Sequence, residues 1–488
     1  MQESSVQKKT SFLPNGIPAL IPLFIFVMGV VSLYFWLTSG TETEFALRLP
    51  SERDLAVSNG VDLGGAVTGK LVKLDGVPSS LTGAWPGFRG ENFDAIVDER
   101  ISIAPTMQEK ISLAKSWPES GPPVLWSKQL GEGFAGAAVL AGRVYVIDYD
   151  QQNEADLIRC MSLDDGKDIW QYSYPVKIKR NHGMSRTVPA VTEKYIVAMG
   201  PKCHVTCLDS TTGEFKWMID LVKQFGTKVP EWYAGQCPII ENDKAIIAPG
   251  GTSLMIAVDC NSGDIIWQTP NPDNWKMTHS SIMPADILGK RMYLYCASDG
   301  VVAVSAEDGN LLWQYPGWKI KLANVACPLV VGDDRILLSG GYNSGAEMVR
   351  LSMQDDRITS QTLFKLDSKV FGSEQHTPIL YDNHIYGIRP DKELACLDLD
   401  GNVVWTSSRT NRFGTQGLGP YSIADGKIYI LDDDGTLTLA EANTTGYVKL
   451  AQAKVLEGPD AWAPMAFASG RLIIRDMNKM ICLDISEK

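Results

Sequence analysis

Seven short segments of this chain carry most of the side chains that could bind a ligand or take part in chemistry. Each segment ends in proline and stands directly before an alternating apolar run. The mixture of imidazole, guanidinium, carboxylate, amide and indole groups is typical of a pocket for a small molecule or a peptide. The candidate residues are His182, Arg186, Trp232, Gln236, His279, Asn324, Glu374, His376, Gln416 and Trp462.

Two other interpretations of these residues remain open. His279, His376 and Glu374 are residue types that ligate metals, but single histidines in separate segments are weak evidence for a metal site. The same side chains could also cap strands and hold water. We therefore predict binding at this site, and we predict neither a metal site nor a catalytic residue.

The segment CHVTC (203–207) offers a second candidate for a metal site. In a strand, Cys203 and Cys207 share one face and His204 points to the other, so the three are poorly placed for a tetrahedral site, and cysteines of the core are the favoured interpretation. Four of the nine cysteines, Cys160, Cys207, Cys396 and Cys482, also recur at one position of the repeat described next. This recurrence favours small buried strand residues over a disulfide framework, although the spacing alone assigns no pairing.

A repeat of about 46 residues organises the chain from residue 124 onwards. In five copies a glycine is followed four residues later by tryptophan, as in Gly213 and Trp217. We expect the glycine to occupy a tight turn and the tryptophan to fill space between repeats, as a structural and not a cofactor-binding residue. The structural tryptophans are Trp126, Trp170, Trp217, Trp267, Trp313 and Trp405.

Each repeat also contains two alternating apolar runs joined by a short Asp, Asn or Gly turn, which is typical of a β-hairpin. Adding the strands on either side of the glycine gives four strands per repeat, the size of one propeller blade. Seven sets end near residues 170, 217, 267, 313, 363, 405 and 450. The C-terminal segment supplies three more strands, and VLWSKQL (124–130) supplies the missing fourth.

The expected fold class is therefore all-β: an eight-bladed β-propeller of four-stranded antiparallel blades, in which an N-terminal strand closes the last blade. An N-terminal transmembrane helix is expected to precede it. The predicted boundaries are a cytoplasmic tail at 1–16, a transmembrane anchor at 17–38, a linker or stalk at 39–82, an N-terminal extension at 83–123 and the propeller at 124–488.

Residues 17–38 are 22 mostly apolar residues, long enough as a helix to cross a hydrocarbon core of about 30 Å. Lys8 and Lys9 precede this span, and Glu42 and Glu44 follow it. The positive-inside rule then keeps the N-terminus in the cytoplasm and exports the propeller, into the periplasm if the cell is a bacterium with two membranes. A cleaved signal peptide is the alternative, but the apolar region is long for one and no clear cleavage site follows.

The charge of the chain limits its partners. The net charge is −12, and no basic run occurs. Since phosphate contacts need clustered lysine and arginine, nucleic acid is not an expected partner.

The repeat with the pattern D-x-x-x-G-x-x-x-W, as in Asp209–Trp217 and Asp259–Trp267, resembles that of the pyrroloquinoline quinone (PQQ) dehydrogenase-like propellers. AWPGFRGEN (84–92) is similar to a segment that precedes many such propellers. The resemblance covers about residues 120–488 and implies the fold. It leaves function open, because the family contains both quinoprotein enzymes and scaffolds such as the outer-membrane-protein assembly lipoprotein.

Two features implied for the family's alcohol dehydrogenases are missing from this sequence. It has no adjacent cysteine pair, and its repeats are too compact to contain the insertions that build an active site. We therefore expect a non-catalytic scaffold that binds a protein or a small ligand at the propeller mouth, with no cofactor. The alternative is an oxidoreductase of alcohols or sugars that uses PQQ with Ca²⁺. A ligand sensor is a third hypothesis, but the N-terminal tail is too short to signal without a partner.

Overall fold

The structure is a computed structural model that describes residues 27–31, 34, 69–97 and 112–487. The chain divides into two units, residues 1–65 and residues 66–488. In the first unit, residues 27–31 and Tyr34 are helical. The rest of the predicted anchor, together with the predicted tail, lies outside the described residues. In the part of the chain that is described, no helix is long and apolar enough to span a membrane.

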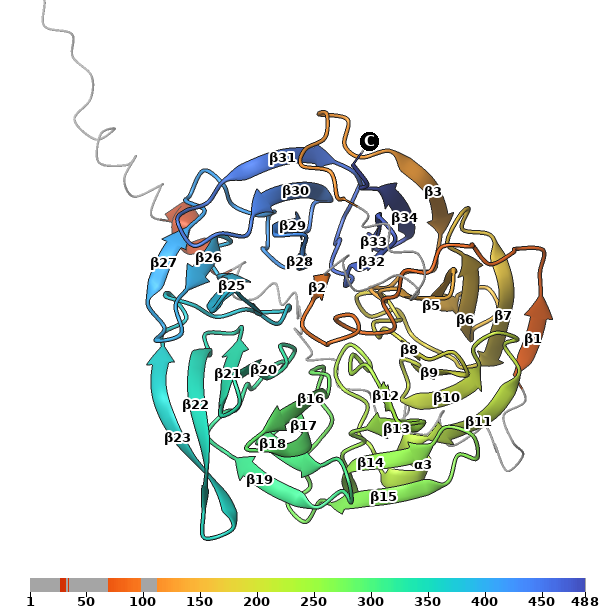
Figure 1. The fold of residues 1–488 in the computed structure, drawn as a ribbon, viewed down its shortest axis with the longest axis horizontal. Coiled ribbons are helices and arrows are strands. Elements are labelled where there is room, and N and C mark those ends of the chain that lie inside the picture. Colours follow the sequence, from red (N-terminus) through yellow and green to blue (C-terminus); the bar gives the residue numbers. More distant parts are fainter. Residues whose placement is uncertain (1–26, 32–33, 35–68, 98–111, 488) are drawn as a thin grey trace, which may run out of the picture. The chain divides into compact units, whose positions relative to one another are not determined.

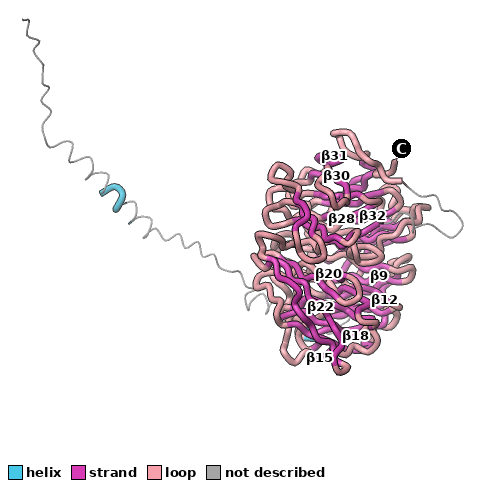
Figure 2. The backbone as a smooth tube through the Cα atoms, turned by 60° about the vertical axis from the view of Figure 1, so that its left-hand side comes forward, coloured by secondary structure: helices cyan, strands magenta, loops and turns pink. Residues whose placement is uncertain are grey.

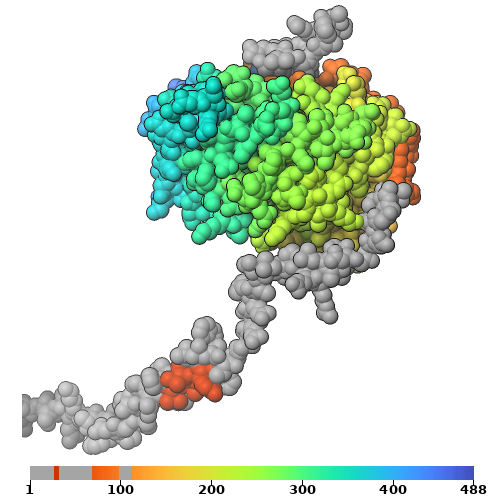
Figure 3. All heavy atoms as spheres, turned by 90° about the horizontal axis from the view of Figure 1, so that it is seen from below, coloured from red at the N-terminus to blue at the C-terminus, as the bar shows by residue number. Residues whose placement is uncertain are grey.

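The second unit is a ring of eight antiparallel β-sheets, as predicted (Figure 1). In each sheet the first strand lies near the axis of the ring and the last lies at its rim. The unit consists mainly of strands and the loops that join them (Figure 2). The blades follow one another around the rim in chain order (Figure 3).

The strands of the first four blades are as follows. Blade 1 contains β4 (Ala138–Leu140), β5 (Arg143–Asp150), β6 (Ala155–Ser162) and β7 (Asp168–Pro175). Blade 2 contains β8 (Ala190–Val191), β9 (Tyr195–Met199), β10 (His204–Asp209) and β11 (Phe215–Asp220). Blade 3 contains β12 (Ile239–Glu241), β13 (Lys244–Ile247), β14 (Ser253–Asp259) and β15 (Ile265–Pro270). Blade 4 contains β16 (Met283–Ile287), β17 (Lys290–Ala297), β18 (Gly300–Ser305) and β19 (Leu311–Tyr315).

The last four blades repeat this plan. Blade 5 contains β20 (Leu329–Val331), β21 (Arg335–Gly340), β22 (Gly345–Gln354) and β23 (Arg357–Leu366). Blade 6 contains β24 (Ile379–Tyr381), β25 (His384–Ile388), β26 (Leu394–Leu397) and β27 (Val403–Thr406). Blade 7 contains β28 (Tyr421–Ala424), β29 (Lys427–Leu431), β30 (Thr436–Glu441) and β31 (Lys449–Lys454). Blade 8 contains β32 (Ala466–Ala468), β33 (Arg471–Arg475), β34 (Lys479–Asp484) and β3 (Val124–Gln129). A short helix, α3 (Leu221–Phe225), follows β11.

Blade 8 joins the two ends of the propeller, which confirms the predicted closure. Strand β3 pairs antiparallel with β34, with Val124 opposite Leu483 and Trp126 opposite Cys482. The Trp126 indole N–H donates to the Leu163 carbonyl in blade 1 at 3.0 Å. The closing strand therefore links blade 8 to blade 1 as well as completing its own sheet.

The tryptophans of the repeat lie between neighbouring blades. A Cβ atom added to Gly213 of blade 2 would lie 2.7 Å from the ring of Trp170 in blade 1. The Trp170 indole also donates to the Thr211 carbonyl in the same turn, at 3.1 Å. Between blades 5 and 6 Phe364 replaces the tryptophan and packs on Gly401, so the copy without tryptophan keeps the same contact.

The recurring cysteines lie opposite these tryptophans in the third strand of each blade. Cys160 faces Trp170 and Cys207 faces Trp217. The other blade tryptophans face Cys396, Cys482 or an alanine. All nine cysteines are buried and unpaired. Since the indole needs a small neighbour across the strand pair, the recurrence reflects packing.

Two segments before the propeller add to it. Strand β1 (Lys70–Lys73), within the predicted linker, pairs with β7 as a fifth strand at the rim of blade 1. Strand β2 (Ile96–Val97), within the predicted extension, pairs parallel with the inner strand β28. The linker therefore does not remain a separate stalk up to residue 82.

Residues 85–97 form a segment within the ring that we call the channel plug. Trp85 exchanges two backbone hydrogen bonds of 2.7 Å with Val139 of blade 1. Arg89 is only 7% exposed and donates to the carbonyls of Thr377 and Pro378 before blade 6. Phe93 packs against the cores of blades 3 and 4. The plug thus connects blades on opposite sides of the ring.

Candidate functional site

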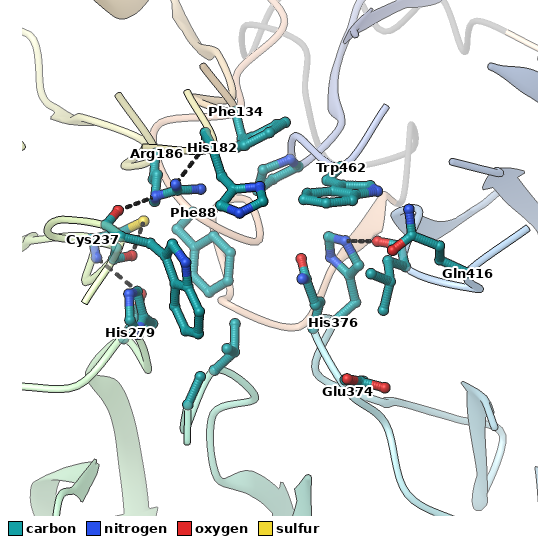
Figure 4. A pocket seen from close by; sticks show the side chains of 18 of the residues that line it. Phe88, Phe134, His182, Arg186, Cys237, His279, Glu374, His376, Gln416 and Trp462 are labelled. Carbon is teal, nitrogen blue, oxygen red and sulfur yellow. Dashed lines mark hydrogen bonds between the residues drawn. The ribbon is translucent and has the colours of Figure 1, made fainter. Parts of the chain in front are cut away.

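A cavity of about 320 Å³, which we call the mouth cavity, opens at the centre of the ring (Figure 4). It is built by the loops that precede the inner strands. Eight of the ten predicted residues line it: His182, Arg186, Trp232, His279, Glu374, His376, Gln416 and Trp462.

Arg186 is fixed on one wall of the cavity by main-chain carbonyls. Its Nη2 donates to the carbonyls of Asn181 at 3.0 Å and His182 at 2.6 Å, and its Nε donates to the Trp232 carbonyl. The guanidinium carbon lies 5.1 Å from the centre of the Phe134 ring. Burial lowers the pKa of Arg186 to about 10, so the group remains charged at neutral pH.

Aromatic rings form much of the remaining wall. Phe134, in the loop after β3, stacks on Trp462 with ring centres 4.8 Å apart. The ring centres of Trp232 and His279 lie 6.2 Å apart. Phe88 of the channel plug also lines the cavity. These surfaces suit a flat or apolar group.

The two buried histidines are neutral hydrogen-bonding groups. Nε2 of His279 lies 2.8 Å from the Glu231 carbonyl, and Nε2 of His376 lies 3.0 Å from the Leu418 carbonyl. Each carbonyl accepts the ring N–H. Burial lowers the pKa of both rings to about 4, with a smaller contribution from the positive charge of Arg186 or Arg89. Both rings are therefore uncharged at neutral pH, whereas His182 is exposed at the rim.

Glu374 is a carboxylate without a cationic partner among the described residues. It is half-buried, and this burial raises its pKa. A Cβ atom added to Gly341 would lie 2.2 Å from Glu374 Cγ. Glycine at position 341 therefore leaves the space that the Glu374 side chain occupies.

Gln416 lies on a loop that one carboxylate organises. Asp433 accepts backbone N–H bonds from Thr415 and Gln416 at one oxygen and from Gly417 at the other, at 2.8 to 3.0 Å. The Gln416 side chain remains exposed at the rim. It can therefore reach a bound molecule without breaking the loop.

Two predicted residues do not line the mouth cavity. The Gln236 amide is fully buried within blade 3, where it donates to the Ala248 carbonyl at 3.1 Å and accepts the Ala248 N–H at 2.9 Å. Asn324 is 3% exposed, and its side chain lies beside the buried Cys296 thiol of blade 4. The expectation that both face the ligand is corrected, because their side chains point into the protein.

A chain of hydrogen bonds between blades supports the wall of the cavity. The Val188 N–H donates to Cys237 Sγ at 3.2 Å, and the Cys237 N–H donates to Ser281 Oγ at 2.9 Å. The Ser281 N–H donates to Cys327 Sγ at 3.2 Å, and the Cys327 N–H donates to Thr377 Oγ1 at 2.8 Å. Five successive blades are joined in this way, so the loops around the cavity are held in register.

The two metal-binding interpretations of the sequence can be compared with the described geometry. Among the described residues there is no group of three or more His, Cys, Asp or Glu side chains that could hold a metal ion. Cys203 lies next to Met277, with the two sulfurs 3.9 Å apart, and Cys207 donates to the Cys260 carbonyl. The CHVTC segment is thus part of the core between blades.

The sequence interpretation missed Phe88, Phe134, Tyr342 and Gln375, which also line the cavity. Phe88 belongs to the WPGFRG segment, which was noted only as a feature before the propeller. Phe134 lies in the loop between the closing strand β3 and β4, and Tyr342 lies between the second and third strands of blade 5. Of these four residues, only Gln375 could have been predicted to line the cavity, because it lies between the predicted residues Glu374 and His376.

Comparison with known proteins identifies the class. A family model described as outer membrane protein assembly factor BamB matches residues 154–407, just over half of the chain. The chain belongs to this family of PQQ-like β-propellers. A comparison with curated proteins finds no match.

Solved structures show the same fold at low sequence identity. BamB from Moraxella catarrhalis is 15% identical with a TM-score of 0.53, and the alignment covers 74% of this chain and 100% of that protein. A europium-containing methanol dehydrogenase is 13% identical with a TM-score of 0.53, covering 80% of this chain and 89% of that protein. At these identities the likeness extends to the fold alone.

Proposed function

We propose that this protein is a membrane-tethered β-propeller outside the cytoplasm, and that it acts as a non-catalytic scaffold which binds a partner protein at the mouth cavity. The observation that carries the proposal is the lining of this cavity. Aromatic rings surround one fixed guanidinium and one carboxylate, and the buried imidazoles are neutral. The arrangement is suited to holding a side chain.

The tether rests on the N-terminal sequence. Residues 17–38 are apolar, with Lys8 and Lys9 before them and Glu42 and Glu44 after them. This asymmetry favours a single span with the propeller outside. The family to which the chain belongs includes a protein assembly factor, which agrees with a role in holding another protein.

The cofactor of the alternative function is a poor match for the residues of the cavity. Ca²⁺ takes six to eight oxygen ligands, and protein sites usually supply several carboxylates. Glu374 is the carboxylate that lines this cavity. The described residues contain no cluster of potential metal ligands. The residues present therefore do not fit a quinone with its calcium ion.

Photo-crosslinking in the native membrane tests the scaffold. A photoreactive amino acid at Gln416, which is exposed at the mouth, should capture one defined partner. The same amino acid at Ser360, which is exposed on the rim strand β23, is the matched control. Capture at neither position, or equal capture of many proteins at both, would contradict the proposal.

A titration of the full-length chain with PQQ and Ca²⁺ tests the alternative. We expect no saturable change in melting temperature. A saturable increase that a chelator reverses would instead support an oxidoreductase, and alcohols and sugars would then be the substrates to examine.

A further inference from the structure

Two charged groups without counter-ions stand on opposite walls of the mouth cavity. Arg186 precedes the inner strand of blade 2, and Glu374 precedes the inner strand of blade 6. In a ring of eight blades these positions are four blades apart and therefore face each other across the axis. Figure 4 shows them on opposite sides of the opening.

Neither charge is neutralised by the described residues. Arg186 forms no ion pair, and its three hydrogen bonds go to carbonyl oxygens from Nε and Nη2. Nη1 makes no hydrogen bond to a described residue. Glu374 likewise has no ion pair or hydrogen bond there. His279 and His376 cannot compensate Glu374, because both rings are neutral at pH 7.

The space between the two charges is apolar. The Phe134–Trp462 stack and Trp232 line the walls, and Phe88 contributes from the channel plug. A volume of about 320 Å³ is enough for one large side chain and the chain that carries it. In a single amino acid with an uncharged side chain, both charges are attached to the same carbon atom and lie close together.

We propose that the mouth cavity binds an extended peptide segment of the partner, with an acidic residue at Arg186, a large apolar or aromatic residue in the centre and a basic residue at Glu374. This inference rests on the proposed function and specifies its partner. In an extended chain, residues four apart are separated by about 13 Å. An extended peptide can therefore present opposite charges at well-separated points.

Synthetic peptides test this charge pattern on the full-length chain in detergent. The probes are fluorescein-labelled, end-blocked Glu-Ala-Trp-Ala-Lys and its reverse, Lys-Ala-Trp-Ala-Glu, measured by fluorescence polarisation. At least one order of the charges should bind saturably. Replacing the glutamate by glutamine, or the lysine by norleucine, should weaken that binding about tenfold, since each change removes one partly buried ion pair.

A charge reversal in the protein makes the test specific. Glu374→Lys should lose the preference for the peptide with opposite charges and gain one for a peptide with glutamate at both ends. Glu214→Gln is the control, because the Glu214 side chain is exposed in the turn between β10 and β11 and does not line the cavity. Gly341→Ala leaves the charge but displaces the Glu374 side chain, and it should weaken binding without reversing the preference.

The result that overturns the inference is an unchanged charge preference in Glu374→Lys, or the absence of saturable binding by either peptide. This failure is separate from that of the proposed function. If the crosslink at Gln416 captures a partner while the peptides fail, the scaffold stands and the peptide pattern is wrong. If the peptides bind as predicted while no partner is captured, the charge pattern stands and the scaffold role is contradicted.

Discussion

Gly213 shows how single residues hold the blades together. Its φ of 75° lies in the left-handed region, and an added Cβ atom would lie 2.7 Å from the ring of Trp170. Gly289 has a similar φ of 71°, but nothing lies within 4 Å of its added Cβ. Substituting both glycines therefore distinguishes the effect of backbone strain, which is common to the two positions, from the effect of the contact between blades, which occurs at Gly213 alone.

We predict that Gly289→Ala costs about 1–2 kcal/mol of stability, the price of a left-handed alanine. Gly213→Ala should cost about 1–3 kcal/mol more, because the methyl group displaces the indole. Urea denaturation of both variants measures the difference. Equal losses would mean that the glycine–tryptophan contact does not help to set the spacing of the blades.

Asp156 predicts a dependence of stability on pH. Its carboxyl is 1% exposed, and burial raises its pKa to about 7, although the neighbouring Tyr174 hydroxyl lowers the pKa by a smaller amount. The unfolded carboxyl titrates near 3.9. Between about pH 4 and 7 the folded protein thus binds more protons than the unfolded chain, so stability falls as the pH rises.

Asp156→Asn should remove this dependence. The unfolding free energy of the variant minus that of the parent protein should be roughly 3–4 kcal/mol larger at pH 8 than at pH 4. This value follows from a difference of about three units between the folded and unfolded pKa of Asp156. Denaturant titrations at both pH values give the comparison. A stability difference that is the same at pH 4 and pH 8 would show that Asp156 does not titrate in this range.

At the scale of elements, the closing strand β3 and the channel plug have separable roles. A chain that begins at Ser112 lacks β1 and the plug but retains β3, whereas a chain that begins at Gly131 also lacks β3. Removing β3 exposes the edge of β34. It also leaves the space of the buried Trp126 side chain empty, and this loss alone should reduce the stability by about 3–5 kcal/mol.

We therefore expect the chain from Ser112 to unfold in one cooperative transition at a lower temperature than the full chain. The chain from Gly131 should melt lower still and aggregate. Differential scanning calorimetry of the two chains and the full-length protein provides the measurement. Equal melting temperatures of the two shortened chains would contradict a clasp formed by β3.

The repeat made the propeller predictable, because the same glycine, tryptophan and hairpin turn recur in nearly every blade. One recurring four-stranded unit is enough to predict a closed ring of blades. The channel plug was not predictable, since WPGFRGEN (85–92) occurs once and some of its partners lie nearly 300 residues away. Arg89, for example, is fixed by the carbonyls of Thr377 and Pro378. Such contacts leave no periodic pattern in the sequence.

The site was only partly predictable for a related reason. The position before an inner strand predicts that a loop reaches the mouth, and eight of the ten residues chosen in this way line the cavity. A loop has no regular alternation, so the sequence does not indicate which side chains face inward. Gln236 shows the result, because its amide bonds to Ala248 within blade 3.

At the scale of the whole molecule, the proposed topology can be measured with thiol chemistry, because all nine native cysteines are buried. We predict that a membrane-impermeant maleimide does not label the folded parent protein and that nine thiols react after denaturation. Ser360→Cys, exposed on the rim strand β23, should then be labelled on intact cells or on spheroplasts. Ser5→Cys, in the N-terminal tail, should be labelled only after the membrane is permeabilised.

If Ser5→Cys reacts as readily as Ser360→Cys before permeabilisation, the tail is not cytoplasmic. The charge asymmetry around residues 17–38 would then not determine the orientation of the chain.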